Sequence, residues 1–88
     1  MTQVRAGVDA VDHAIGALLA TRFGYMRAAA RIKPQRGAVR DEARKAEVIA
    51  NAVAQAKAEG YPVDVATELW ERLVEASIAY ELKAFDAR

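Results

Sequence analysis

The chain has 88 residues, a net charge of +1, no cysteine and a single histidine. This length predicts one small domain over residues 1–88, and the composition excludes disulfides, thiolate zinc sites and histidine-rich metal sites. Two observations argue against nucleic-acid binding. The net charge is near neutral, and the basic residues are not interleaved with exposed-looking aromatics.

Alanine is the commonest residue and glycine and proline are few, which predicts an all-α fold. The first helix is expected from Thr2 or Gln3 to Lys33, because Pro34 disfavours α geometry in the residue before it. One face of this helix is apolar or aromatic except at Arg22, whose guanidinium stays charged at neutral pH. The positions on this face are Val4, Val8, Val11, Ile15, Leu18, Arg22, Tyr25, Ala29 and Ile32.

A loop is predicted at 34–40, followed by a second helix that runs to about Glu59. Asp41 suits the N-cap or the first turn of this helix, where an acidic side chain can accept backbone hydrogen bonds. Gly60 suits the C′ position that ends it.

A third helix is predicted to run to about Phe85, with Asp64 as its N-cap. Ser77 and Glu81 share one face of this helix, although the residues that flank them are apolar. A glutamate on an apolar face is as unexpected as Arg22 in the first helix.

Two interpretations of these polar residues remain open. A guanidinium that points into a core is costly unless an anion meets it there. Either a buried Arg22–Glu81 salt bridge joins two helices, or both groups face a ligand. Lys33 lies close to three turns after Arg22 and points the same way, although a lysine at a helix end is often simply solvated.

The length of the first helix predicts a dimer. Thirty residues of helix span about 45 Å, whereas the second and third helices span roughly 28 and 33 Å. They leave the N-terminal half of the apolar face uncovered, and a symmetric dimer with the long helices side by side is the simplest remedy. In an antiparallel dimer, Arg5 of one chain could reach the Arg22 site of the other.

The sequence predicts a cytoplasmic protein. No apolar run approaches the roughly 20 residues of a membrane span, and the N-terminus lacks the continuous apolar stretch of a secretory signal.

The polar residues form a pattern that covers nearly the whole chain: Arg5, Arg22, Lys33, the segment VRDEARKAEV at 39–48, Ser77 and Glu81. In order and spacing it resembles the all-helical chorismate mutase family. The resemblance implies an intertwined homodimer of three-helix protomers with two equivalent sites. It also implies that a small dianion, chorismate, rearranges to prephenate in a pericyclic step that needs no metal, cofactor or covalent intermediate.

The resemblance assigns four residues to the carboxylates of the substrate. It implies that Arg22 and the partner's Arg5 each bind one carboxylate. Arg44 supports the anionic end of the substrate, and Ser77 helps to hold a carboxylate.

The remaining roles concern the ether oxygen and the ring hydroxyl. The resemblance implies that Lys33 and Glu81 hydrogen-bond the ether oxygen, and that Asp41 lies near the ring hydroxyl. Glu81 can donate only as a neutral acid, which apolar surroundings favour. The family often has a glutamate for the ring hydroxyl at the position of Lys45, so this chain departs from the pattern there.

Two other functions remain as alternatives. The segments RFGYMRAAARIK at 22–33 and IAYELKAF at 78–85 look like the isochorismate-pyruvate lyase branch of the same fold, which makes salicylate and pyruvate. VRDEARKAEV and Ser77 look more like true mutases, which favours chorismate as the substrate. The third possibility is a non-catalytic helical dimer or regulatory partner.

Overall fold

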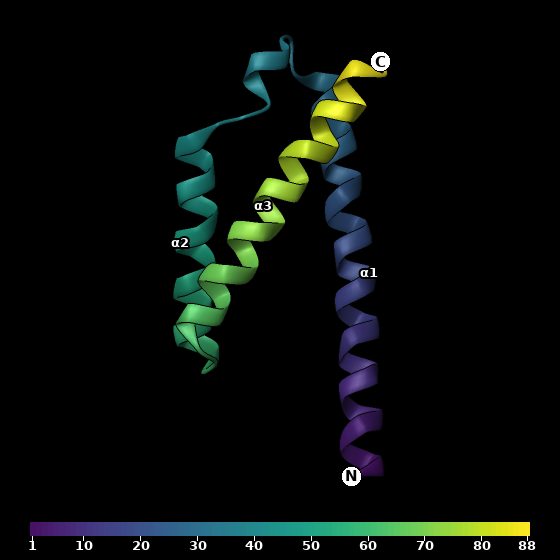
Figure 1. Cartoon of the computed structure of the whole chain (residues 1–88), viewed down its shortest axis with the longest axis vertical. Coiled ribbons are helices and arrows are strands. Elements are labelled where there is room, and N and C mark those ends of the chain that lie inside the picture. Colours follow the sequence, from purple (N-terminus) through teal and green to yellow (C-terminus); the bar gives the residue numbers. More distant parts are fainter.

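The computed structural model describes all 88 residues and contains three α-helices (Figure 1). They are α1 (Thr2–Ile32), α2 (Glu42–Glu59) and α3 (Val63–Asp86), and a short 3-10 helix, η1 (Arg36–Ala38), lies between α1 and α2. The prediction of an all-α fold with a long N-terminal helix is therefore confirmed. None of these helices is both long enough and apolar enough to cross a membrane.

The ends of α1 and α2 follow from local chemistry. Lys33 leaves the helix with an extended backbone, φ −61° and ψ 133°, as expected for the residue before a proline. Asp41 is the N-cap of α2, and its side chain accepts a hydrogen bond from the backbone N–H of Arg44 at 3.0 Å. Gly60 ends α2 in the left-handed conformation, with φ 85°, which a residue without Cβ adopts freely.

The start of α3 differs from the sequence prediction. Asp64 is not the N-cap, because α3 begins at Val63, directly after Pro62, and no side chain caps it. Pro62 is the N-cap residue, with φ −59° and a non-helical ψ of 127°, and helical backbone begins at Val63. Asp64 is already helical, so it lacks the non-helical backbone of an N-cap residue. Asp64 lies in the first turn, where its negative charge still favours the helix dipole.

The helices form an elongated molecule with α3 in contact with both of the others. α3 packs against α1 and against α2, whereas α1 and α2 do not approach one another closely. The molecule measures 49 × 24 × 15 Å, and Figure 1 shows the N-terminal half of α1 extending away from α2 and α3. α3 is therefore the helix that joins α1 and α2.

The core is small for a chain of this length. Only 9 of the 88 residues are buried, and the central cluster consists of Val39, Val74 and Ile78. Large apolar side chains on α1 are instead open to solvent, with Leu18 70% and Val4 59% exposed. The uncovered apolar face that the sequence predicted is therefore present in the single chain.

Candidate functional site

A cavity of about 360 Å³ lies where one face of each helix meets the loop before α2. This volume falls within the range of small-molecule pockets, about 300–1,000 Å³. Residues three and four apart line it on each helix, as the geometry of a helix face requires. Among the lining residues are six of the seven site residues predicted from the sequence: Arg22, Lys33, Asp41, Arg44, Ser77 and Glu81.

Arg22 enters the cavity without an anionic partner in the protein. Its Nη1 donates to the Oγ of Ser77 at 2.5 Å, and that hydroxyl donates to the carbonyl of Leu73 at 2.7 Å. Burial, and next the positive charge of Arg44, lower the pKa of the Arg22 guanidinium, yet an arginine remains charged at neutral pH. The Arg22–Glu81 salt bridge considered from the sequence is not formed.

Glu81 forms its ion pair with Lys33 instead. The Nζ of Lys33 lies 2.7 Å from Oε2 of Glu81, whose side chain is only 5% exposed. The same ammonium lies 3.5 Å from the carbonyl oxygen of Val39. Lys33 is therefore not simply solvated, and the cavity holds a partly buried ion pair next to a guanidinium that has no carboxylate partner.

The α2 wall of the cavity begins with Asp41 and Arg44. Oδ1 of Asp41 is occupied by the N-cap hydrogen bond, which leaves Oδ2 free to accept from a ligand. The guanidinium of Arg44 pairs with Glu47 one turn later, and both side chains are largely exposed. A surface pair of this kind is weak, so Arg44 can turn to a ligand at little cost.

Lys45 completes the α2 wall. Its Nζ lies 2.7 Å from Glu71 and 2.8 Å from Glu75, both on α3. Glu75 also binds Arg40 with two hydrogen bonds, at 2.9 and 3.1 Å. Among the cations that line the cavity, Arg22 is thus the one without a carboxylate partner.

The family model for chorismate mutase type II matches residues 4–82, nearly the full length of the chain. The chain belongs to the chorismate mutase type II family. The family identified from the sequence is therefore confirmed, and with it an isomerase that converts chorismate to prephenate. No curated protein and no solved structure shows significant similarity to the chain.

Arg5 is the one predicted site residue of this chorismate mutase domain that does not line the cavity. It is exposed on the part of α1 that extends away from α2 and α3, and its side chain forms no hydrogen bond or ion pair. Within one protomer it lies too far along the helix from Arg22, about 25 Å, to contact the same small ligand.

Sequence reasoning missed two features around the chorismate mutase cavity. The first is the pair Glu71 and Glu75, which share a face of α3 at i and i+4 and both contact Lys45. Their four-residue spacing in the sequence indicates this shared face. The second is Arg88, whose Nη1 donates to the carbonyls of Ala30 at 3.2 Å and Lys33 at 2.6 Å. No local pattern indicates this second contact, because its partners lie more than 50 positions away.

Proposed function

We propose that the cavity binds chorismate as a dianion and holds it in the conformation that rearranges to prephenate. The observation that supports this most directly is Arg22, a cation whose protein partner is the neutral hydroxyl of Ser77. A carboxylate of the substrate supplies the missing anion, and Ser77 adds a second donor once its hydroxyl turns from the carbonyl of Leu73 to the substrate. Because the reaction is intramolecular, fixing the geometry of the substrate supplies much of the rate enhancement.

Lys33 is the proposed donor to the ether oxygen. Negative charge develops on this oxygen as the C–O bond breaks, and a preorganised ammonium stabilises it in the transition state. The 2.7 Å contact with Glu81 fixes the position of this ammonium before the substrate enters. Lys33 and Glu81 therefore act as one unit on the side of the cavity formed by α1 and α3.

Glu81 is proposed to donate to the ether oxygen beside Lys33 as its neutral acid. In the free protein its carboxyl group lies 2.7 Å from the ammonium of Lys33 and is almost fully buried. On the α2 wall, Oδ2 of Asp41 accepts from the ring hydroxyl, and Arg44 supports the anionic end.

The second substrate carboxylate is proposed to bind Arg5 of a second protomer in an intertwined dimer. An apolar groove of about 560 Å³ runs between α1 and the first half of α3, next to Arg22. It is lined by large apolar side chains, among them Ile15, Leu18, Leu69 and Trp70. The antiparallel α1 of a partner covers this groove and brings the partner's Arg5 to the cavity. A stable folded monomer of 9.6 kDa in sedimentation at micromolar concentration would contradict this.

Product analysis tests the proposed reaction. Purified protein is incubated separately with chorismate and with isochorismate, and the products are separated by chromatography. Prephenate from chorismate, without added metal or cofactor, is the expected result. Salicylate from isochorismate, with chorismate unchanged, would instead identify the lyase branch, and no product from either would favour a non-catalytic dimer.

A cytoplasmic location stays a prediction from the sequence.

A further inference from the structure

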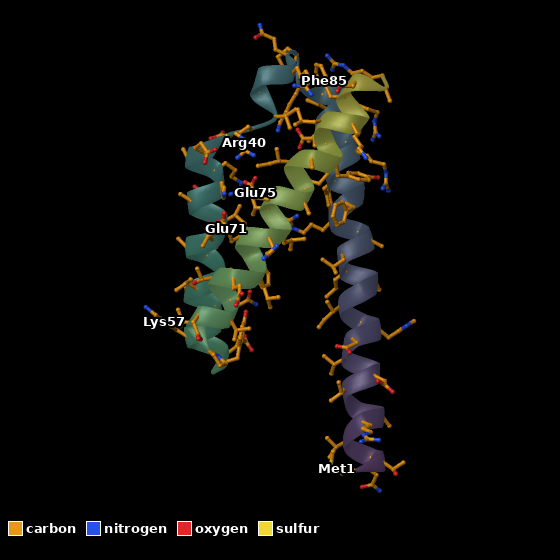
Figure 2. All side chains as sticks on the ribbon, viewed as in Figure 1. Met1, Arg40, Lys57, Glu71, Glu75 and Phe85 are labelled. Atoms are coloured by element: carbon orange, nitrogen blue, oxygen red, sulfur yellow. The ribbon has the colours of Figure 1, made fainter.

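Lys45 separates the cavity from two carboxylates of α3. Its side chain lines the cavity and is only 17% exposed, while its Nζ contacts both Glu71 and Glu75. Neither glutamate lines the cavity itself. Figure 2 shows the labelled Glu71 and Glu75 side chains between α2 and α3, beside Arg40. Lys45 is therefore the lining residue through which the acidic pair borders the cavity.

Glu75 keeps its negative charge at neutral pH. Hydrogen bonds from Arg40 and then Lys45 lower the pKa of Glu75 to about 2. The surrounding cluster contains Glu42, Glu71 and Glu75 against Arg40 and Lys45, so it carries three negative and two positive charges. Removal of the Lys45 charge would leave an excess of carboxylates next to a cavity that binds a dianion.

We propose that Lys45 determines substrate affinity by screening the carboxylates of the substrate from Glu71 and Glu75. This inference rests on the proposed function, because it requires an anionic ligand in the cavity. The repulsion that Lys45 cancels acts on the bound substrate and on the transition state alike. Loss of the Lys45 charge therefore raises KM and leaves kcat nearly unchanged, as expected for an interaction that acts equally on the bound substrate and the transition state.

A set of variants distinguishes screening from a merely structural tie between α2 and α3. Lys45→Gln removes the positive charge and should raise KM for chorismate about tenfold at low ionic strength, the size of one charge change several ångströms away. The Glu71→Gln/Glu75→Gln double variant keeps Lys45 but removes its acidic partners, and should lower KM below that of the wild type. The triple variant should return KM to within about threefold of the wild type, because no unscreened carboxylate remains.

Arg40→Gln is the matched control. Arg40 joins the same two helices through Glu75, but it does not line the cavity. It should raise KM less than Lys45→Gln does, because Lys45 still lines the cavity and contacts both carboxylates. Circular dichroism and thermal unfolding establish that each variant is folded, and the double variant keeps the inference testable if Lys45→Gln does not fold.

The results separate this inference from the proposed function. Prephenate formation with the same KM in wild type and Lys45→Gln would overturn the screening role and leave the mutase activity intact. A triple variant as poor as Lys45→Gln would also overturn it, since Lys45 would then act by direct contact or by joining the helices. An unchanged KM in the double variant would count against screening as well. Absence of prephenate with the wild type would overturn the proposed function and this inference together.

Discussion

Replacement of Arg22 by glutamine should separate its role in binding from any role in stability. In the structure Arg22 makes one side-chain hydrogen bond, to the neutral hydroxyl of Ser77, and no ion pair. The substitution to glutamine therefore removes only this contact. A hydrogen bond from a charged donor contributes about 1.5–3 kcal/mol to the free energy of unfolding. Removal of an unpaired, partly buried charge recovers part of its desolvation cost, so the net loss is smaller. We expect the free energy of unfolding to change by no more than about 1 kcal/mol, or roughly 4–8 °C in Tm.

Catalysis should respond far more strongly than stability to Arg22→Gln. Truncation of one partner of a desolvated charge pair costs about 2–5 kcal/mol, which lowers kcat/KM about 30-fold to about 4,000-fold. The assay follows prephenate formation and thermal unfolding on the same samples. Protein concentration is held fixed, because the apparent stability of a dimer depends on it.

Arg27→Gln provides the matched control for Arg22→Gln. Arg27 also lies on α1 and donates to a hydroxyl of α3, that of Tyr80, at 2.8 Å, but it does not line the cavity. It should cost similar stability without a comparable loss of activity. A drop of about 3–5 kcal/mol in the stability of Arg22→Gln, with full activity in the folded fraction, is the signature of a buried structural bridge and would refute the reasoning.

Three further predictions concern acid stability, the donor role of Glu81 and the C-terminal contact. Because the pKa of Glu75 is held at about 2 in the folded protein, below its ordinary value of 4.5, its contribution to stability is present above pH 4.5 and is lost as the pH falls to about 2. Acid unfolding should therefore show wild type more stable than Glu75→Gln at pH 6, with the difference gone near pH 2. Because Glu81 must be protonated to donate, kcat/KM of wild type should fall at alkaline pH, while that of Glu81→Gln, which keeps a donor at every pH, should stay flat. Equal profiles would contradict this role. Arg88→Ala should lower the stability by about 1 kcal/mol and also lower kcat, because Arg88 fixes the backbone carbonyl of Lys33; an unchanged Tm and kcat would argue against it.

The helix boundaries were largely predictable because they depend on neighbouring residues. Pro34 ends α1, Asp41 caps α2 and Gly60 ends it, each through contacts within a few positions. The N-cap of α3 was predicted wrongly because two local signals compete there. Pro62 starts the helix before Asp64 can cap it.

The positions of the site residues were predictable, but their partners were not. A helical period places Arg22 and Lys33 on one face of the first helix as predicted, and Ser77 and Glu81 on one face of α3. The relative shift of the two helices, which the sequence does not encode locally, then pairs Arg22 with Ser77 and Lys33 with Glu81. The extended backbone of Lys33 beyond the end of α1 also changes where its ammonium can reach.

A mixing experiment tests most directly whether two protomers share each site. Arg5→Ala and Arg22→Ala chains are each expected to be folded and inactive as homodimers. After equal mixing and verified subunit exchange, half of the dimers are mixed, and each of these has one intact site with Arg22 from one chain and the partner's Arg5. The mixture should then recover about a quarter of the wild-type activity. Verified mixed dimers with no more activity than the two separate variants would contradict the shared site.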